Sequence, residues 1–126
     1  MPELARLSLE SQGDVELARV AGEVDASNVA DLSQRLLAAV PNQARALVLD
    51  LSETSYIDSS GISLIFDAAA RLRNRHQELR LVVTPRSFVG EVLAAVSMER
   101  SVAIDPALDD ALRAVGDSDS SDSEAS

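Results

Sequence analysis

Four consecutive residues, Asp58, Ser59, Ser60 and Gly61, are the part of this sequence best suited to chemistry. A serine hydroxyl can carry a phosphoryl group, and the carboxylate before it can orient that hydroxyl or bind a metal ion held by a partner. If the serines open a helix, the positive end of the helix dipole favours an anion such as phosphate at that point. The segment therefore predicts a phosphorylation site, with Ser59 or Ser60 as the acceptor.

The same four residues also fit a purely structural role. Side-chain oxygens at a helix start accept hydrogen bonds from free backbone N–H groups, so the segment could be a helix cap alone. We interpret Gly61 as leaving space for another chain to approach. Phosphorylation would add about two negative charges, which a helix N-terminus tolerates, so its effect would fall on a docked partner.

Strands and helices alternate around this segment. Strands are predicted where apolar residues alternate or form a short run, and helices where they recur every three or four positions. The predicted strands cover residues 4–11, 15–21, 46–51, 79–83 and 102–104, and the predicted helices cover residues 29–40, 60–76, 85–96 and 106–115. The first two strands form a predicted β-hairpin, and residues 52–57 a loop.

Polar residues mark where the helices begin. Ser27 and Asn28 are possible N-caps of the first helix, and Thr84 followed by Pro85 predicts the start of the third. The predicted apolar stripe of that third helix consists of Phe88, Val92 and Val96.

The order of the elements predicts an α/β fold with a small mixed β-sheet and about four helices packed against it. Residues 46–51 form a continuous apolar run, which is typical of a central strand buried on both faces. The length suits one domain, which we assign to residues 1–116. Residues 117–126 are acidic and rich in serine, and we expect them to be a disordered tail.

The composition excludes several functions. A net charge of −10 argues against direct binding to nucleic acid and favours a partner with a basic surface. The chain has no cysteine, so disulfides and thiolate chemistry are excluded. We found no membrane span and no signal peptide in the sequence, and we therefore expect a cytoplasmic protein.

The sequence contains few residues suited to enzymatic catalysis. His76 is the single histidine, and the serines are not in a Gly-x-Ser-x-Gly elbow, so a serine hydrolase is disfavoured. No Gly-rich phosphate-binding loop is present. A receiver domain phosphorylated on Asp50 is also disfavoured. Such a domain needs an acidic pair at the end of the first strand and a lysine near the phosphoryl group, and this sequence has neither. We therefore predict a non-enzymatic interaction module.

The segment 22–25 (Gly-Glu-Val-Asp), a buried strand and the segment 56–62 (Tyr-Ile-Asp-Ser-Ser-Gly-Ile) follow one another in an order that resembles the STAS-domain anti-sigma factor antagonists of bacteria. The resemblance extends from about Leu4 to Val115. It implies that Ser59, directly after Asp58, is phosphorylated by an anti-sigma factor that is itself a serine kinase.

The resemblance also implies a partner-switching cycle. The unphosphorylated antagonist binds the kinase and frees a sigma factor, phosphorylation ends this binding, and a serine phosphatase resets the protein. Asp58 would support the phosphoacceptor, Ser60 would be a neighbouring hydroxyl, Gly61 would belong to the partner-binding segment, and Asp25 would lie in the adjacent loop. In this cycle ATP would belong to the kinase, so the resemblance implies that the chain itself needs no cofactor, and we expect no metal site. We expect a monomer or a weak dimer.

Two features depart from the family pattern. Ser97-Met98 stands where many members have Gly-Leu, and the acidic tail is not typical. The alternative within the same family is a STAS scaffold or regulatory subunit of a transport or stress-sensing complex that is not phosphorylated in this cycle. The serine at position 59 favours the switch over the scaffold.

Overall fold

The computed structural model of the protein describes the backbone of residues 5–125 and the side chains of residues 5–116. The strands are β1 (Ala5–Gln12), β2 (Val15–Val24), β3 (Ala46–Asp50), β4 (Thr54–Ile57), β5 (Glu78–Val82) and β6 (Ala103–Asp105). The α-helices are α1 (Val29–Ala39), α2 (Ser59–Asn74), α3 (Phe88–Ala95) and α4 (Leu108–Ala125), and a short 3-10 helix, η1 (Met98–Arg100), follows α3. The α/β class and the four helices are as predicted.

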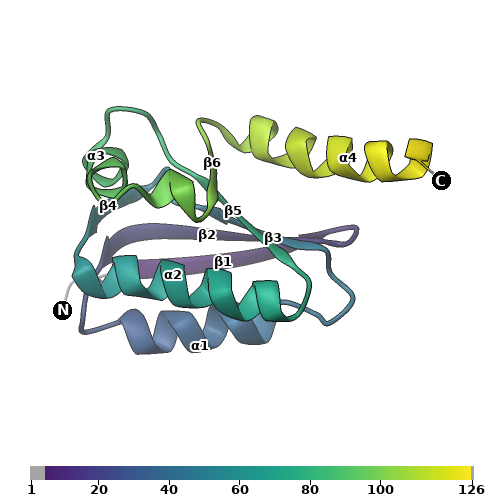
Figure 1. The fold of residues 1–126 in the computed structure, drawn as a ribbon. Helices are drawn as coiled ribbons and strands as arrows, with labels where there is room; N and C mark the ends of the chain where they lie inside the picture. Colours follow the sequence, from purple (N-terminus) through teal and green to yellow (C-terminus); the bar gives the residue numbers. More distant parts are fainter. Residues whose placement is uncertain (1–4, 126) are drawn as a thin grey trace.

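The strands form one mixed sheet in the order β1-β2-β3-β5-β6, with β4 paired to the end of β2 (Figure 1). β1 and β2 are antiparallel, which confirms the predicted hairpin, and the other neighbours are parallel. Gly13 takes a positive φ of 62° in the hairpin turn, a conformation that glycine adopts at little cost. All five residues of β3 are buried, as predicted for the central strand.

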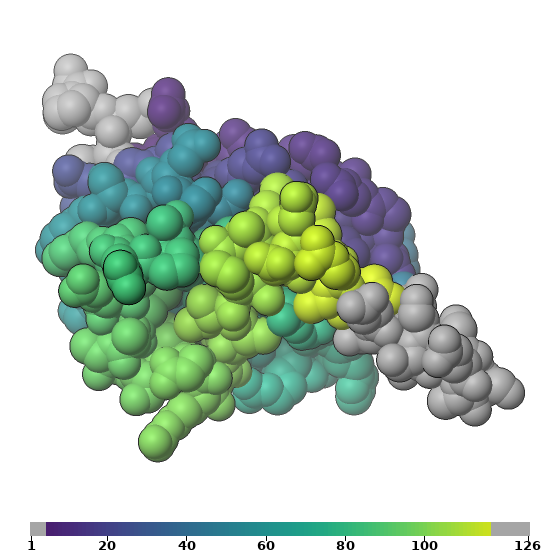
Figure 2. Space-filling model, turned by 90° about the horizontal axis from the view of Figure 1, so that it is seen from above, coloured from purple at the N-terminus to yellow at the C-terminus, as the bar shows by residue number. Residues whose placement is uncertain are grey.

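Helices cover both faces of the sheet. α1 and α2 lie on one face and α4 on the other (Figure 1), and Figure 2 looks onto the α4 side. The larger core lies under α1, α2 and α3 and includes Leu36 and Ile65. The smaller core, under α4, is formed by Val15, Leu17, Ala46, Val48, Val82, Ala111 and Val115. Aliphatic side chains thus supply both cores, and each fully buried Val, Leu or Ile contributes about 1.5–3 kcal/mol.

One prediction about the sheet was wrong: part of the segment 52–57 is a strand and not a loop. β2 pairs with β3 through residues 15–19 and with β4 through residues 22–24, and the β2–β4 pairing has a register shift between Gly22 and Glu23. The Thr54 hydroxyl donates to the Val20 carbonyl over 2.7 Å and holds β4 in place. A strand of four residues is too short to show a clear period, so its partner decides its structure.

The start of α3 also differs from the prediction. The N-cap is Ser87, not Thr84, since the Ser87 hydroxyl accepts from the Gly90 N–H over 3.0 Å. The same hydroxyl donates to the Thr84 carbonyl over 2.7 Å. Residues 84 and 85 are therefore part of the turn before the helix.

The predicted apolar stripe of α3 was displaced by one residue. Val89 and Leu93 face the core, whereas Phe88 and Val96 are exposed and Val92 is half-buried. Both sets of residues have a spacing of four, so the period alone does not tell which side faces inward.

α4 begins at Leu108, two residues later than predicted, and its backbone continues to Ala125. The side chains of residues 117–126 lie outside the described set, and the disordered tail and the domain boundary at residue 116 stay predictions. Among the described residues, none of the helices combines the length and the apolar character that a membrane span requires.

Ser97 adopts a left-handed backbone conformation, with φ 57° and ψ 41°, directly before the fully buried Met98. This is the position where many family members are expected to have glycine. Because a side chain in this conformation costs about 1–2 kcal/mol, Ser97→Gly should raise the free energy of unfolding by about 1 kcal/mol, after some loss to the greater entropy of the unfolded chain. Urea unfolding of the two proteins tests this, and a less stable glycine variant would contradict it.

Candidate functional site

The predicted site lies where the parallel strands β2 and β4 end. Val24 and Ile57 are paired across these strands, and Asp25 and Asp58 follow them directly. The Asp58 N–H donates to the Val24 carbonyl over 3.3 Å, which links the two strand ends. The fold thus brings together, at the carboxyl ends of β2 and β4, two loops that are far apart in the sequence. Asp25 lies in the loop next to Asp58, which is the position that the resemblance implied.

Asp58 is the N-cap of α2. Its Oδ1 atom accepts hydrogen bonds from the Ser60 N–H over 2.9 Å and from the Gly61 N–H over 3.2 Å. The sequence predicts a cap within the segment 58–61 without selecting the side chain, and the structure assigns the capping oxygen to Asp58. Capping is therefore the role of Asp58 that the geometry demonstrates.

The cap leads to a testable difference between two substitutions of Asp58. An asparagine at this position would keep an oxygen that accepts from the same N–H groups, whereas an alanine would leave them without this acceptor. Asp58→Ala should therefore lower the free energy of unfolding by about 1 kcal/mol, and Asp58→Asn by much less. Thermal unfolding of both variants checks this, and equal losses would speak against a role in capping.

Ser59 and Ser60 differ in exposure. Ser59 is the first residue of α2 and is exposed, whereas Ser60 is half-buried. Within the described part of the chain, no hydrogen bond engages the Ser59 hydroxyl. Because Asp58 already caps the helix, the Ser59 hydroxyl is available for chemistry at the positive end of the helix dipole.

Gly61 faces inward, which corrects our interpretation that it leaves space for another chain. A Cβ atom on Gly61 would overlap Cγ1 of Ile57 and would lie 2.9 Å from its Cδ1 and 3.0 Å from Cγ1 of Val24. The missing side chain therefore lets the first turn of α2 pack closely on the ends of β2 and β4. Gly61 positions Ser59 through this packing.

Asp25 organises the turn between β2 and α1. Its Oδ1 atom accepts from both the N–H and the hydroxyl of Ser27, over 2.9 and 2.6 Å. Asn28 occupies the N-cap position of α1 without a capping bond from its side chain, which instead bonds to Glu23 and to the Asp25 N–H. The two predicted caps of α1 thus hold the loop that lies beside the start of α2.

Exposed aromatic residues lie near the site and were not identified from the sequence. Tyr56 of β4 stacks on Phe88 at the start of α3, with ring centroids 5.6 Å apart, and their exposed fractions are 40% and 53%. Phe66 on α2 is 37% exposed and lies seven residues, or two turns, after Ser59. The sequence contains just one Tyr and two Phe, and this small number could have directed attention to them. All three side chains are exposed at the surface.

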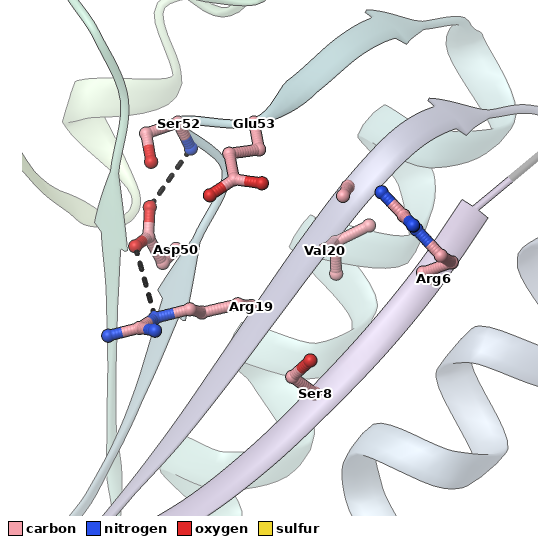
Figure 3. Close-up of a pocket in the computed structure, with 8 residues that line it drawn as sticks. Arg6, Ser8, Arg19, Val20, Asp50, Ser52 and Glu53 are labelled. Carbon is pink, nitrogen blue, oxygen red and sulfur yellow. Dashed lines mark hydrogen bonds and ion pairs between the residues drawn. The ribbon is translucent and has the colours of Figure 1, made fainter.

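Asp50 lines a separate pocket of about 260 Å³ on the face of the sheet opposite to α1 and α2 (Figure 3). Its Oδ1 atom accepts from the Ser52 N–H over 2.9 Å, and its Oδ2 atom is 3.8 Å from the Arg19 guanidinium. The described residues form no cluster of three or more His, Cys, Asp or Glu side chains that could hold a metal ion. His76 is exposed at the end of α2, away from the serines.

Comparison with known proteins defines the class. A family model described as "Mlab, STAS domain" matches residues 7–108. The match covers most of the chain, so this protein belongs to the STAS domain family. The resemblance inferred from residues 22–25 and 56–62 is thereby confirmed, together with the fold that it implied.

Particular relatives agree with this class. An anti-sigma-B factor antagonist of Listeria monocytogenes is 37% identical over 62 residues, which cover 49% of this chain and 54% of the relative. The match thus spans about half the length of the curated relative. The crystal structure of an anti-sigma factor antagonist from Mycobacterium paratuberculosis superposes with a TM-score of 0.81 at 25% identity, covering 91% of this chain and 97% of that one.

A third structure supports the fold alone. The Bacillus cell fate determinant SpoIIAA, solved in its phosphorylated form, has a TM-score of 0.61 at 18% identity and covers 87% of this chain and 99% of its own. The Listeria and Mycobacterium relatives are named as anti-sigma factor antagonists, which are regulatory proteins without enzymatic activity, and this agrees with the non-enzymatic class predicted from the sequence.

Proposed function

We propose that this protein is an anti-sigma factor antagonist that works by partner switching in the cytoplasm. The unphosphorylated form binds an anti-sigma factor that is also a serine kinase, and this binding frees a sigma factor. Phosphorylation of Ser59 by the kinase ends the interaction, and a serine phosphatase restores it. ATP belongs to the kinase, so the chain itself requires no cofactor.

The proposal rests on the exposure of the Ser59 side chain, which does not cap the helix. Its hydroxyl is exposed at the first position of α2, and the capping of that helix depends on Asp58. A phosphoryl group can therefore be added without loss of the cap. The helix dipole favours the added charge on the folded protein, so the change acts on a partner and not on the fold.

The surface around Ser59 suits a protein partner. We define the docking surface as Tyr56, Ser59, Phe66 and Phe88, whose side chains are exposed at the start of α2 and beside it. Exposed aromatic residues of this kind are enriched at interfaces and often provide much of the binding energy. The net charge of −10 favours a partner with a basic surface.

The relatives add independent support. The Listeria and Mycobacterium proteins are described as anti-sigma factor antagonists, and SpoIIAA has been solved with phosphate attached. A scaffold that is not phosphorylated would not require an exposed hydroxyl at position 59. The exposed hydroxyl therefore favours the switch.

The test is to locate the phosphate after incubation of the full chain with ATP and a candidate anti-sigma factor kinase. Mass spectrometry of the intact protein and its peptides should find one phosphate, on Ser59. Ser59→Ala should abolish the label, and the matched variant Ser60→Ala should retain it. Labelling confined to the serines of the tail, or to Ser60, would overturn the proposed switch.

A further inference from the structure

The outer edge of β1 is a surface that the switch does not use. β1 pairs with β2 along one side over all eight of its residues, and no strand among the described residues lies on the other side. In Figure 2 the purple segment that contains β1 forms part of the rim of the molecule. A long edge strand without proline or lysine is an open template for pairing with another strand.

The opposite edge of the sheet is different. β6 has three residues and is followed by Pro106, which has no N–H to donate. Short edge strands and proline are common means of preventing strand pairing. Of the two edges, β1 is therefore the one open to a partner.

The hairpin geometry fixes which backbone groups of β1 point outward. Gln12 and Val15 are paired around a two-residue turn, so they exchange hydrogen bonds with each other. Because hydrogen-bonded and non-hydrogen-bonded pairs alternate along the ladder, the even-numbered residues of β1 bond to β2. The outward groups are those of Ala5, Leu7, Leu9 and Ser11.

We propose that β1 pairs antiparallel with β1 of a second copy of this chain, about a two-fold axis at Ser8. In this register Leu7 bonds to Leu9 of the second copy, and Arg6 lies directly opposite Glu10 of the second copy. Arg6 and Glu10 are then in non-hydrogen-bonded pairs, where facing side chains are closest. Two-fold symmetry forms this ion pair twice.

Charge specifies the register. Arg6 and Glu10 are both exposed and are the two charged residues of β1. Figure 3 shows Arg6 and Ser8 extending from β1 beside β2. Arg6 also has an interaction within its own chain, so the inference depends on its position and not on a lack of partners. If the two strands were paired in a register shifted by one residue or more, Arg6 would no longer lie opposite Glu10 of the second copy.

Apolar surface supports the same register. Leu9 is 44% exposed, although it lies on the same face of the strand as Leu7, which packs against the larger core. Pairing places Leu9 beside Leu7 of the second copy and covers part of this surface. Because β4 and the start of α2 lie on the other side of β2, the docking surface stays accessible in each copy.

The test is sedimentation of the full chain over a range of concentrations, with charge-reversal variants. The wild type should form a reversible dimer. Arg6→Glu and Glu10→Arg should each raise the dissociation constant by about tenfold, because each places like charges opposite one another twice. The double variant exchanges the charges and should restore the dimer. Arg73→Glu, the same charge change at an exposed position on α2, should have little effect.

Hydrogen exchange gives a second measurement that does not depend on a substitution. The amides of Leu7 and Leu9 should exchange more slowly as the concentration of the wild type increases. A wild type that stays monomeric, a dimer insensitive to the single reversals, or single losses that the double variant does not restore would each overturn the proposal. A dimer with unprotected Leu7 and Leu9 amides would also overturn it.

Discussion

Ser59→Asp is expected to lower the affinity for the anti-sigma factor kinase by about tenfold or more, whereas Ser59→Ala should bind like the wild type. The aspartate places a negative charge on the exposed position that the proposed partner meets as a neutral hydroxyl. Burying this charge against the kinase groups that contact a neutral hydroxyl costs several kcal/mol in lost hydration, even where the surrounding kinase surface is basic. About 1.4 kcal/mol already corresponds to a factor of ten in affinity. Isothermal titration calorimetry with the purified kinase measures the difference.

This loss of affinity should not arise from unfolding. A carboxylate in the first turn of α2 interacts favourably with the helix dipole, so the melting temperature of Ser59→Asp should stay the same or rise slightly. Ser101→Asp adds the same charge at an exposed serine that lies near Arg73 at the far end of α2, outside the docking surface, and should bind like the wild type. Equal affinities of Ser59→Asp and Ser59→Ala would contradict the proposed mechanism.

Gly61→Ala is expected to lower the free energy of unfolding by about 1–3 kcal/mol. The new methyl group overlaps Ile57 and approaches Cγ1 of Val24 to 3.0 Å, so either α2 or the ends of β2 and β4 must move. Alanine is intrinsically better than glycine in a helix by up to about 1 kcal/mol, which offsets part of this cost. We expect the overlap to dominate, since the nearest atom is close to the backbone of Ile57. Denaturant unfolding provides the measurement.

Gly116 provides the matched control. It lies in α4, and a Cβ atom added there meets nothing within 4 Å. Gly116→Ala should therefore keep or raise the stability, because helix propensity acts there without a steric cost. If Gly61→Ala is as stable as Gly116→Ala, then the close packing at the start of α2 is not needed.

The predictions from sequence succeeded where a long segment has one clear pattern. The central strand 46–51 was predicted from a continuous apolar run, and the structure buries all of these residues. The segment Asp58-Ser59-Ser60-Gly61 was identified because it follows that strand and opens a helix. Its position at the edge of the sheet follows from the parallel pairing of β2 and β4.

The errors arose where tertiary contacts decide between local alternatives. Three side chains in a row could cap α2, and the packing of the strand ends selects Asp58. In α3, Phe88 and Val89 each start a stripe with a spacing of four, and Phe88 turns outward to stack on Tyr56. The exposed aromatic residues could not be identified because an aromatic side chain in a sequence usually indicates core.

In the proposed cycle the unphosphorylated protein frees a sigma factor from its anti-sigma factor. The most direct measurement adds the full chain, with Ser59 either unmodified or phosphorylated, to a purified complex of the sigma factor and the anti-sigma factor, and follows the free sigma factor by size-exclusion chromatography. We predict release by the unmodified protein and none by the phosphorylated form. Release by both forms, or by neither, would contradict the claim.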